Sequence, residues 1–356
     1  MTASNVDKRK TIFTYIKRFF IVLFTTLILI VGALMLVMLE ISEGPSESWK
    51  EYFVCTVRET SALKFLASWY YTPEQIAEYE GSGRNSVTNE VTDPGLIQMN
   101  QKVTHEKNEN TDGDDIPSDS EKPSVSDEPI SVVDISGGTY KGKLMMVRDP
   151  SKVVVGISGR FGEEYEGKTV MNMLNSYGAV AATNAGGFYD EGGVGNGGVP
   201  LGIVVSQGKL CYGSMKSTYE VIGFDKDNIL RVGKMTGQQA MDVGIRDAVS
   251  FGPILLVNGK PQNEEKKLGG GFNPRTAIGQ TSDGTVLILV IDGRQIDSLG
   301  ATYDDLITIM QEYGAVNAAN LDGGSSSHMI YNGEIITTCS SLYGPRRMPT
   351  CIMVMP

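Results

Sequence analysis

An uncharged apolar run near the N-terminus constrains this chain more than any other feature of its sequence. Residues 19–39, FFIVLFTTLILIVGALMLVML, form a stretch of 21 residues without a charge. An α-helix needs about 20 apolar residues to cross the hydrocarbon core of a bilayer. The run therefore predicts a transmembrane helix, and we take residues 19–41 as the lipid-spanning anchor.

Charges on either side of the anchor predict its orientation. Five basic residues precede it and acids follow it closely: Lys8, Arg9, Lys10, Lys17 and Arg18 before, and Glu40, Glu43 and Glu47 after. Basic flanks stay in the cytoplasm, so residues 1–18 are expected inside and everything after the anchor outside. The alternative is a cleaved signal peptide. Such peptides have a shorter apolar core and a small-residue cleavage site, which LVMLEISEG does not offer.

Composition divides the rest of the chain into three parts. Residues 42–80 read as juxtamembrane helices, with Thr72 as an N-cap and Pro73 as a first helical residue; they form a spacer or face a partner or the membrane. Residues 81–138 hold 12 acids against 4 bases and are expected to be a disordered acidic tether. Residues 139–356 form the folded domain. They hold 21 acids and 19 bases and have no basic stripe that could contact phosphates, so nucleic acid is not expected as a partner.

The folded domain contains an internal repeat with an offset of 136 residues. MNMLNSYGAVAATNAGGF at 171–188 and ITIMQEYGAVNAANLDGG at 307–324 share seven identical positions. Each copy reads as a helix, a glycine stop, a strand and a Gly-rich loop, and Gly178 and Gly314 stand where a left-handed helix cap is wanted. With a strand before each helix, we expect an α/β domain of two related strand–helix–strand units whose strands run parallel. Asn-Gly turns add antiparallel hairpins, so the sheet is mixed parallel/antiparallel.

Acids are expected where these strands end. Asp292 closes the first strand of the second unit and Asp322 closes the next, and ligands of such sheets bind at the carboxyl ends of the strands. The first unit has its own acid, Asp190, slightly after its strand. NLDGGSSS adds accessible backbone amides and hydroxyl donors, so the residues expected to bind substrate there are Gly323, Gly324, Ser325 and Ser326. This combination suits a sugar or a phosphate ester.

A hairpin is predicted to bring an arginine to the same place. Asp283-Gly284 between two apolar runs indicates a two-residue loop. The register that follows places Arg275 opposite Asp292, with Cβ atoms about 5 Å apart on one face. A cross-strand ion pair would explain this without any function. Beside Asp322 and the Gly-rich loops, the arrangement favours an arginine that holds phosphate with its planar guanidinium.

The motifs NAGGFYD, SFGPILLVNGK, NPRTAIGQ, LVIDGR and NLDGGSSS, in this order, resemble those of the phosphodiester glycosidase family. The resemblance covers residues 150–356 and implies hydrolysis of a sugar-1-phosphodiester at the sugar–oxygen bond. Bacterial members are exported or membrane-anchored exopolysaccharide-type proteins, so a carbohydrate or phosphosugar polymer of the cell envelope is the expected substrate. Besides Arg275, Asp292, Asp322 and residues 323–325, the resemblance singles out Asn184, Gly187, Phe188 and Gly252 as expected substrate-binding residues. From its position after the first unit's strand, Asp190 is expected to bind substrate as well.

The expected chemistry gives each charged residue a role. Arg275 stabilises the leaving phosphate, Asp322 acts as base or nucleophile, and Asp292 orients Arg275 or a substrate hydroxyl. No cofactor is expected. A calcium or magnesium ion on Asp292 and Asp322 is the competing role, weakly supported because no spaced acidic loop is present.

The alternative function is a non-catalytic glycan-binding accessory protein of exopolysaccharide or wall-polymer assembly. A serine acyl hydrolase is disfavoured, because GGSSS is not G-x-S-x-G and the SALK of residues 61–64 lacks partner motifs. Two cysteines of an exported chain, Cys339 and Cys351, could pair or stay free. His328 is expected to pack beside a strand. Arg346 and Arg347 are expected on a late loop, either solvated or contacting a phosphopolymer.

Overall fold

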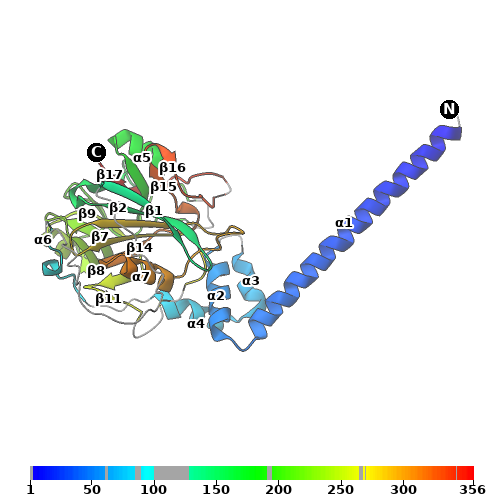
Figure 1. The fold of residues 1–356 in the computed structure, drawn as a ribbon, viewed down its shortest axis with the longest axis horizontal. Coiled ribbons are helices and arrows are strands. Elements are labelled where there is room, and N and C mark those ends of the chain that lie inside the picture. The colour runs from blue at the N-terminus through cyan, green and yellow to red at the C-terminus, as the bar shows by residue number, and fades with distance from the viewer. Residues whose placement is uncertain are drawn as a thin grey trace, which may run out of the picture.

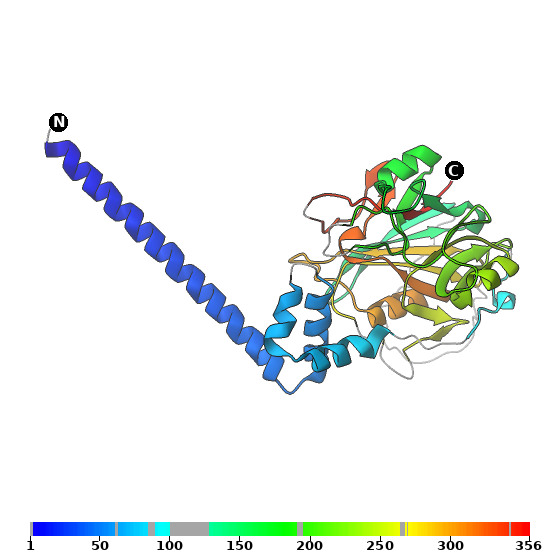
Figure 2. The ribbon, with the colours of Figure 1, turned by 180° about the vertical axis from the view of Figure 1, so that it is seen from behind.

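Helix α1 (Ala3–Glu43) stands away from the rest of the chain in both views of the fold (Figures 1 and 2). Within this computed structural model, its segment Ile12–Glu43 has a mean hydropathy of 2.9, and none of its apolar window is buried against protein. By length and composition the helix can cross a bilayer. The structure describes residues 3–60, 63–84, 90–99, 128–190, 195–263, 268, 270–341 and 343–356.

Three short helices follow, which we call the helical unit: α2 (Glu47–Arg58), α3 (Lys64–Tyr70) and α4 (Pro73–Arg84). They share a small apolar core of their own, made of Val54, Val57, Ala67, Tyr71 and Ile76. The start of α4 is as predicted, because Thr72 and Gln75 exchange hydrogen bonds between side chain and backbone. The helix runs four residues past the predicted boundary at residue 80. The helical unit packs beside the domain at the base of α1 (Figure 2).

The domain contains three sheets. A seven-stranded sheet has the order β1-β2-β13-β12-β14-β10-β11, and two five-stranded sheets have the orders β16-β15-β4-β17-β3 and β6-β5-β9-β7-β8. The strands are β1 (Ile130–Ser136), β2 (Lys141–Val147), β3 (Val153–Ile157), β4 (Ala181–Asn184), β5 (Val204–Ser206), β6 (Lys209–Tyr212), β7 (Thr218–Asp225), β8 (Leu230–Thr236), β9 (Ile245–Ser250), β10 (Ile254–Val257), β11 (Lys260–Pro261), β12 (Arg275–Thr281), β13 (Val286–Ile291), β14 (Ala315–Leu321), β15 (Met329–Tyr331), β16 (Glu334–Ile335) and β17 (Thr350–Val354).

One large apolar core lies where the three sheets face each other, and side chains from all of them fill it, including Met145, Ile288, Ile352 and Phe224. Helix α7 (Tyr303–Glu312) covers the outer face of the seven-stranded sheet, and α5 (Val170–Tyr177) covers the sheet that contains β4 and β17. The short helix α6 (Gly237–Asp242) packs on the third sheet. The packing of the three sheets on this core therefore fixes the positions of the strand ends at which the candidate site lies.

The α/β class and the two strand–helix–strand units are confirmed, with a correction to the pairing. In each unit the two strands run in the same direction, but a third strand lies between them. β12 separates β13 from β14, and β17 separates β3 from β4. Every pairing between the described strands is consequently antiparallel. The predicted glycine stops hold, because Gly178 and Gly314 follow their helices with φ of 69° and 76°.

The predicted domain boundary at residue 139 is too late. Strand β1 pairs along its whole length with β2, so the sheet begins at Ile130. The expected disorder of residues 81–138 is also wrong for residues 90–99. There Thr92 is buried, donates to the carbonyl of Val232 and accepts from its amide. The amide of Gln98 donates to Ser282 O at 2.7 Å. Residues 100–127 lie outside the described residues.

The predicted two-residue hairpin loop is wrong. The amide of Thr281 bonds Thr285 O at 3.0 Å, so three residues, 282–284, form the loop. The register slips by one, and Arg275 pairs with Ile291 instead of Asp292. Side chains of successive strand residues point to opposite faces, so the structural reason for coupling Arg275 to Asp292 disappears. The cysteines Cys339 and Cys351 are free thiols in the structure.

Candidate active site

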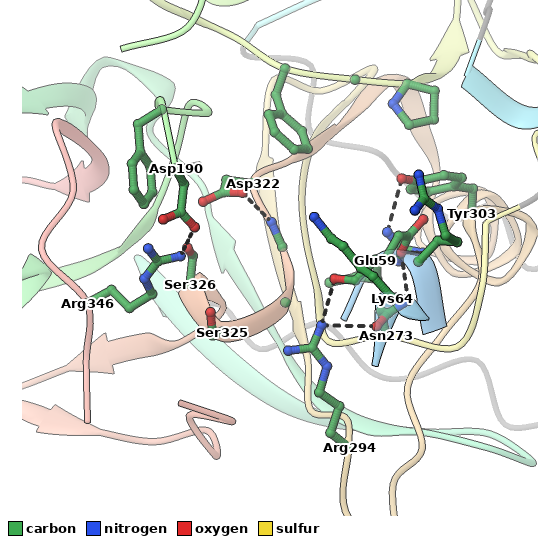
Figure 3. A pocket seen from close by; sticks show the side chains of 18 of the residues that line it. Glu59, Lys64, Asp190, Asn273, Arg294, Tyr303, Asp322, Ser325, Ser326 and Arg346 are labelled. Carbon is green, nitrogen blue, oxygen red and sulfur yellow. Dashed lines mark hydrogen bonds and ion pairs between the residues drawn. The ribbon is translucent and has the colours of Figure 1, made fainter. Parts of the chain in front are cut away.

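A cavity of about 580 Å³ opens at the sheet edge where β12 begins and β14 ends. Continuing the register of Thr276 with Leu321 places Arg275 level with Asp322. The loops after β4 and β9, the 3-10 turn Gly324–Ser326 and a late loop complete the domain's share of the wall. The helical unit supplies the remainder through Arg58, Glu59 and Lys64. Figure 3 shows the resulting division, with Asp190, Asp322 and Arg346 on one side and Glu59, Asn273 and Arg294 on the other.

Asp322 lies half-buried directly after β14, where its backbone is tightly held. Its amide donates to Ala185 O at 2.9 Å, and its carbonyl accepts from the side chain of Asn184. Burial raises the pKa of Asp322 to about 6, although hydrogen bonds from Ser326 and from the amide of Gly323 act to lower it. A carboxyl group with this pKa changes its protonation state near neutral pH, as acid–base catalysts require.

Asp190 stands beside Asp322 in a different electrostatic environment. Its carboxylate pairs with Arg346 Nη1 at 2.7 Å and accepts from the amide of Gly195 at 2.7 Å. Burial acts to raise the pKa of Asp190, but these partners outweigh it, and the net pKa is below the ordinary value. Arg346 also stacks over the ring of Phe188, 4.9 Å from its centroid. The two carboxyl groups of this wall therefore have pKa values shifted in opposite directions.

Arg275 lies on the opposite wall and is almost completely buried. Its Nε donates to Ala301 O at 3.1 Å, and its terminal nitrogens donate to Tyr303 Oη at 3.0 Å and Gly271 O at 2.8 Å. A carboxylate from outside the domain meets its charge, since Glu59 Oε2 lies 2.9 Å from Nη2. Burial acts to lower the pKa of Arg275, but Glu59 and Tyr303 reverse this and raise it.

Several predicted site residues do not line the cavity. The carboxylate of Asp292 accepts from the amide of Thr338 at 2.7 Å, away from Arg275. Asn184 is buried behind Asp322, where its Oδ1 accepts from Thr276 Oγ1 at 2.9 Å. Gly187 also lies outside the lining. The predicted residues that do line it are Asp322, Arg275, Phe188, Asp190, Gly252, Gly323, Gly324, Ser325 and Ser326.

The alternative role of Asp292 and Asp322, binding a calcium or magnesium ion, finds no suitable group of ligands among the described residues. Among the described residues, no group of three or more His, Cys, Asp or Glu side chains is arranged to hold a metal ion. Asp292 and Asp322, the two acids considered for that role, have separate hydrogen-bond partners.

Comparison with known proteins identifies the domain. The profile of the phosphodiester glycosidase family matches residues 177–355, half of the chain. The chain belongs to the phosphodiester glycosidase family. The matched region contains Asp190 and Asp322 of one cavity wall and Arg275 and Arg294 of the opposite wall.

Relatives extend this assignment. The SPbeta prophage-derived uncharacterized protein YomE of Bacillus subtilis (strain 168) is 30% identical over 226 residues, which is 59% of this chain and 34% of YomE. The bovine N-acetylglucosamine-1-phosphodiester alpha-N-acetylglucosaminidase is 26% identical over 209 residues, 52% of this chain and 38% of the relative. The match thus spans about a third of the length of these relatives.

A solved structure shares the fold. It is the catalytic domain of the zebrafish N-acetylglucosamine-1-phosphodiester alpha-N-acetylglucosaminidase, described as auto-inhibited by its pro-peptide. The TM-score is 0.54 at 24% identity, covering 64% of this chain and 82% of the zebrafish chain. This phosphodiester glycosidase fold is the domain that the sequence motifs indicated.

Sequence reasoning missed part of the cavity wall of this phosphodiester glycosidase domain. Asn273 begins the motif NPRTAIGQ and Arg294 ends the motif LVIDGR, so the motifs contained both residues without marking them. No sequence signal marks Glu59 or Lys64, because they lie far from the motifs in a segment that reads as a spacer. The other residues missed are Arg58, Glu220, Phe251 and Tyr303.

Proposed function

We propose that this protein is a hydrolase that cleaves the sugar–oxygen bond of a sugar-1-phosphodiester in a cell-surface glycan or phosphopolymer. The observation that carries the proposal is the two-walled cavity. One wall offers two carboxyl groups with pKa values moved apart, and the other offers two guanidinium groups. The sugar fits against the carboxyl wall, and the phosphate fits against the arginines.

The chemistry requires only these groups. The carboxylate of Asp322 takes a proton from water as the water oxygen bonds to the anomeric carbon, or it attacks that carbon itself. The anomeric carbon–oxygen bond breaks, and its electron pair stays on the phosphate oxygen. The phosphate monoester that leaves gains one negative charge, which Arg275 and Arg294 stabilise. Asp190, held ionised by Arg346, is placed to orient a sugar hydroxyl.

The name of the bovine relative supplies the first test substrate, an N-acetylglucosamine 1-(alkyl phosphate). We expect the full chain to release reducing sugar from it. In ¹⁸O-labelled water the label should enter the sugar, because the proposal places cleavage at the sugar–oxygen bond. Label in the phosphate would assign phosphorus–oxygen cleavage and contradict the mechanism.

Asp322→Asn tests the catalytic assignment. It keeps the shape of the side chain and removes its basicity, so hydrolysis should fall by about 10²–10⁴. Asp283→Asn makes the same change in the β12–β13 loop and serves as the control, provided that thermal unfolding shows both variants folded. Full activity of Asp322→Asn would remove Asp322 from the mechanism. Binding of glycan without hydrolysis would support the accessory-protein alternative.

We also propose that α1 anchors the domain outside the cytoplasm, with the N-terminus inside. The support is the length and hydropathy of the helix and the basic residues before it.

A further inference from the structure

Arg275 and Arg294 both contact one residue that lies outside the domain. This residue is Glu59, which follows the last residue of α2. Its Oε2 lies 2.9 Å from Arg275 Nη2 and accepts from Asn273 Nδ2 at 2.6 Å. Its backbone carbonyl accepts from Arg294 Nη2 at 3.3 Å. One residue of the helical unit thus contacts three polar side chains of the domain.

The side chains around Glu59 also form hydrogen bonds within the domain. Arg275 keeps its bonds to Ala301 and Tyr303, and its guanidinium lies over the Tyr303 ring, 4.1 Å from the centroid. Arg294 Nη2 also donates to Asn273 Oδ1 at 3.2 Å. The geometry is therefore preorganised for an acceptor, and Glu59 supplies only the acceptor.

The charge of the site does not balance. At this contact the two guanidinium groups carry +2 and the carboxylate of Glu59 carries −1, and the cations Arg58 and Lys64 line the same cavity. Burial lowers the pKa of Arg294; the charge of Glu59 acts to raise it, and the nearby charge of Arg275 acts to lower it further. A ligand with two negative charges would neutralise the pair, and a phosphate monoester near pH 8 is such a ligand.

The helical unit has an internal core that does not depend on the domain. Besides Glu59, its contacts with the domain include Thr56 Oγ1, which accepts from the amide of Phe272 at 3.0 Å, the close packing of Gly271 on Thr56, and the rings of Trp49 and Tyr52 against Phe272. Displacing the carboxylate would not require the helices to unfold.

We propose that Arg275, Arg294 and Asn273 form a binding site for a phosphate dianion, and that Glu59 occupies this site as an internal competing ligand. The naming of phosphate rests on the proposed function. Substrate must then displace Glu59, and the phosphate monoester formed by hydrolysis is the form that this site holds best. Binding is reciprocal, so phosphate in the site weakens the attachment of the helical unit.

The test measures binding, so it does not depend on turnover. Inorganic phosphate at pH 8 is titrated calorimetrically into the detergent-solubilised full chain and into Glu59→Gln. Glu78→Gln, an equal charge change on an exposed residue of α4, is the control. Glu59→Gln removes the competing charge and keeps an acceptor oxygen, so phosphate binding should tighten by roughly 10–100-fold, which is about 1.4–2.8 kcal/mol. Adding Arg294→Met to Glu59→Gln should abolish the gain.

The outcomes separate this inference from the proposed function. Equal phosphate affinity in wild type and Glu59→Gln, or a gain that survives Arg294→Met, would overturn the site. If Glu59→Gln is unstable, Glu59→Asp keeps the charge while withdrawing the carboxylate, and it too should bind phosphate more tightly than Glu78→Gln. Tight phosphate binding without hydrolysis of any sugar-1-phosphodiester would retain the anion site and reject only the catalytic proposal.

Discussion

At the scale of single residues, we predict that the carboxyl group of Asp322 has opposite effects on activity and on stability. Its pKa in the folded chain, about 6, is raised chiefly by burial. Ionising it opposes folding, so stability is lost as pH rises from about 4 through 6. Catalysis by the ionised form should instead increase over this range. We expect kcat/KM to rise with a midpoint near pH 6.

Because ionised Asp322 opposes folding, a variant without this charge should be more stable at high pH. Asp322→Asn should have a higher Tm than wild type at pH 8 and nearly the same Tm at pH 4, where wild-type Asp322 is protonated. Thermal melts at the two pH values measure this directly. A gain that is equal at both pH values would trace the effect to packing instead of charge.

His328 supports the same carboxyl group from behind. Its buried Nδ1 lies 2.8 Å from Ser326 O, so Nδ1 carries the proton and donates. Ser326 in turn bonds Asp322 and lowers its pKa. We expect His328→Leu to reduce kcat by roughly tenfold and to move the pH midpoint upward. His328→Asn keeps a donor near Nδ1 and should restore both. An unchanged midpoint in a folded His328→Leu variant would confine His328 to packing.

At the scale of elements, local sequence signals predicted what local interactions determine. The stops of α5 and α7 depend on Gly178 and Gly314, and the motifs placed Asp322 correctly at a strand end. The strands inserted between partners, β12 and β17, depend on long-range pairing that no local pattern encodes. The predicted length of the β12–β13 loop was wrong because Asp283 Oδ1 accepts from Thr281 Oγ1 and from the amide of Thr285. These side-chain bonds favour a three-residue loop.

Gly284 completes that loop and has a φ of 92°. A Cβ there would also lie 3.2 Å from Met99. Gly284→Ala should lower the free energy of unfolding by about 1–2 kcal/mol, measured by urea denaturation. Gly138→Ala is the matched control, because Gly138 has open space around it and no positive φ. Equal effects of the two substitutions would show that the loop conformation does not limit stability.

At the scale of the whole molecule, the sequence predicts the segments of the chain but not how these segments pack against one another. Thr92 in the acidic segment and Glu59 in the juxtamembrane segment contact the domain from 140 and more than 210 residues away in sequence. Such contacts have no periodicity or motif. For this reason the resemblance identified the carboxyl wall and Arg275 but missed the residues that the helical unit adds to the cavity.

The orientation of the chain can be tested on one thiol. Cys211 is the exposed free cysteine among the described residues. A membrane-impermeant maleimide added to intact cells should label the wild type and leave Cys211→Ser unlabelled. Labelling that requires broken cells would place the domain in the cytoplasm and reverse the proposed orientation.

The position of Glu59 has a further consequence for how the protein responds to cleavage. While the chain is intact, the helical unit is tethered to the domain, and its effective concentration at the anion site is independent of protein concentration. A protease cut among residues 100–127 would turn this contact into an association between two molecules. Occupancy by Glu59 would then decline on dilution. A severed protein should gain activity when it is diluted, whereas the intact chain should have the same specific activity at every concentration.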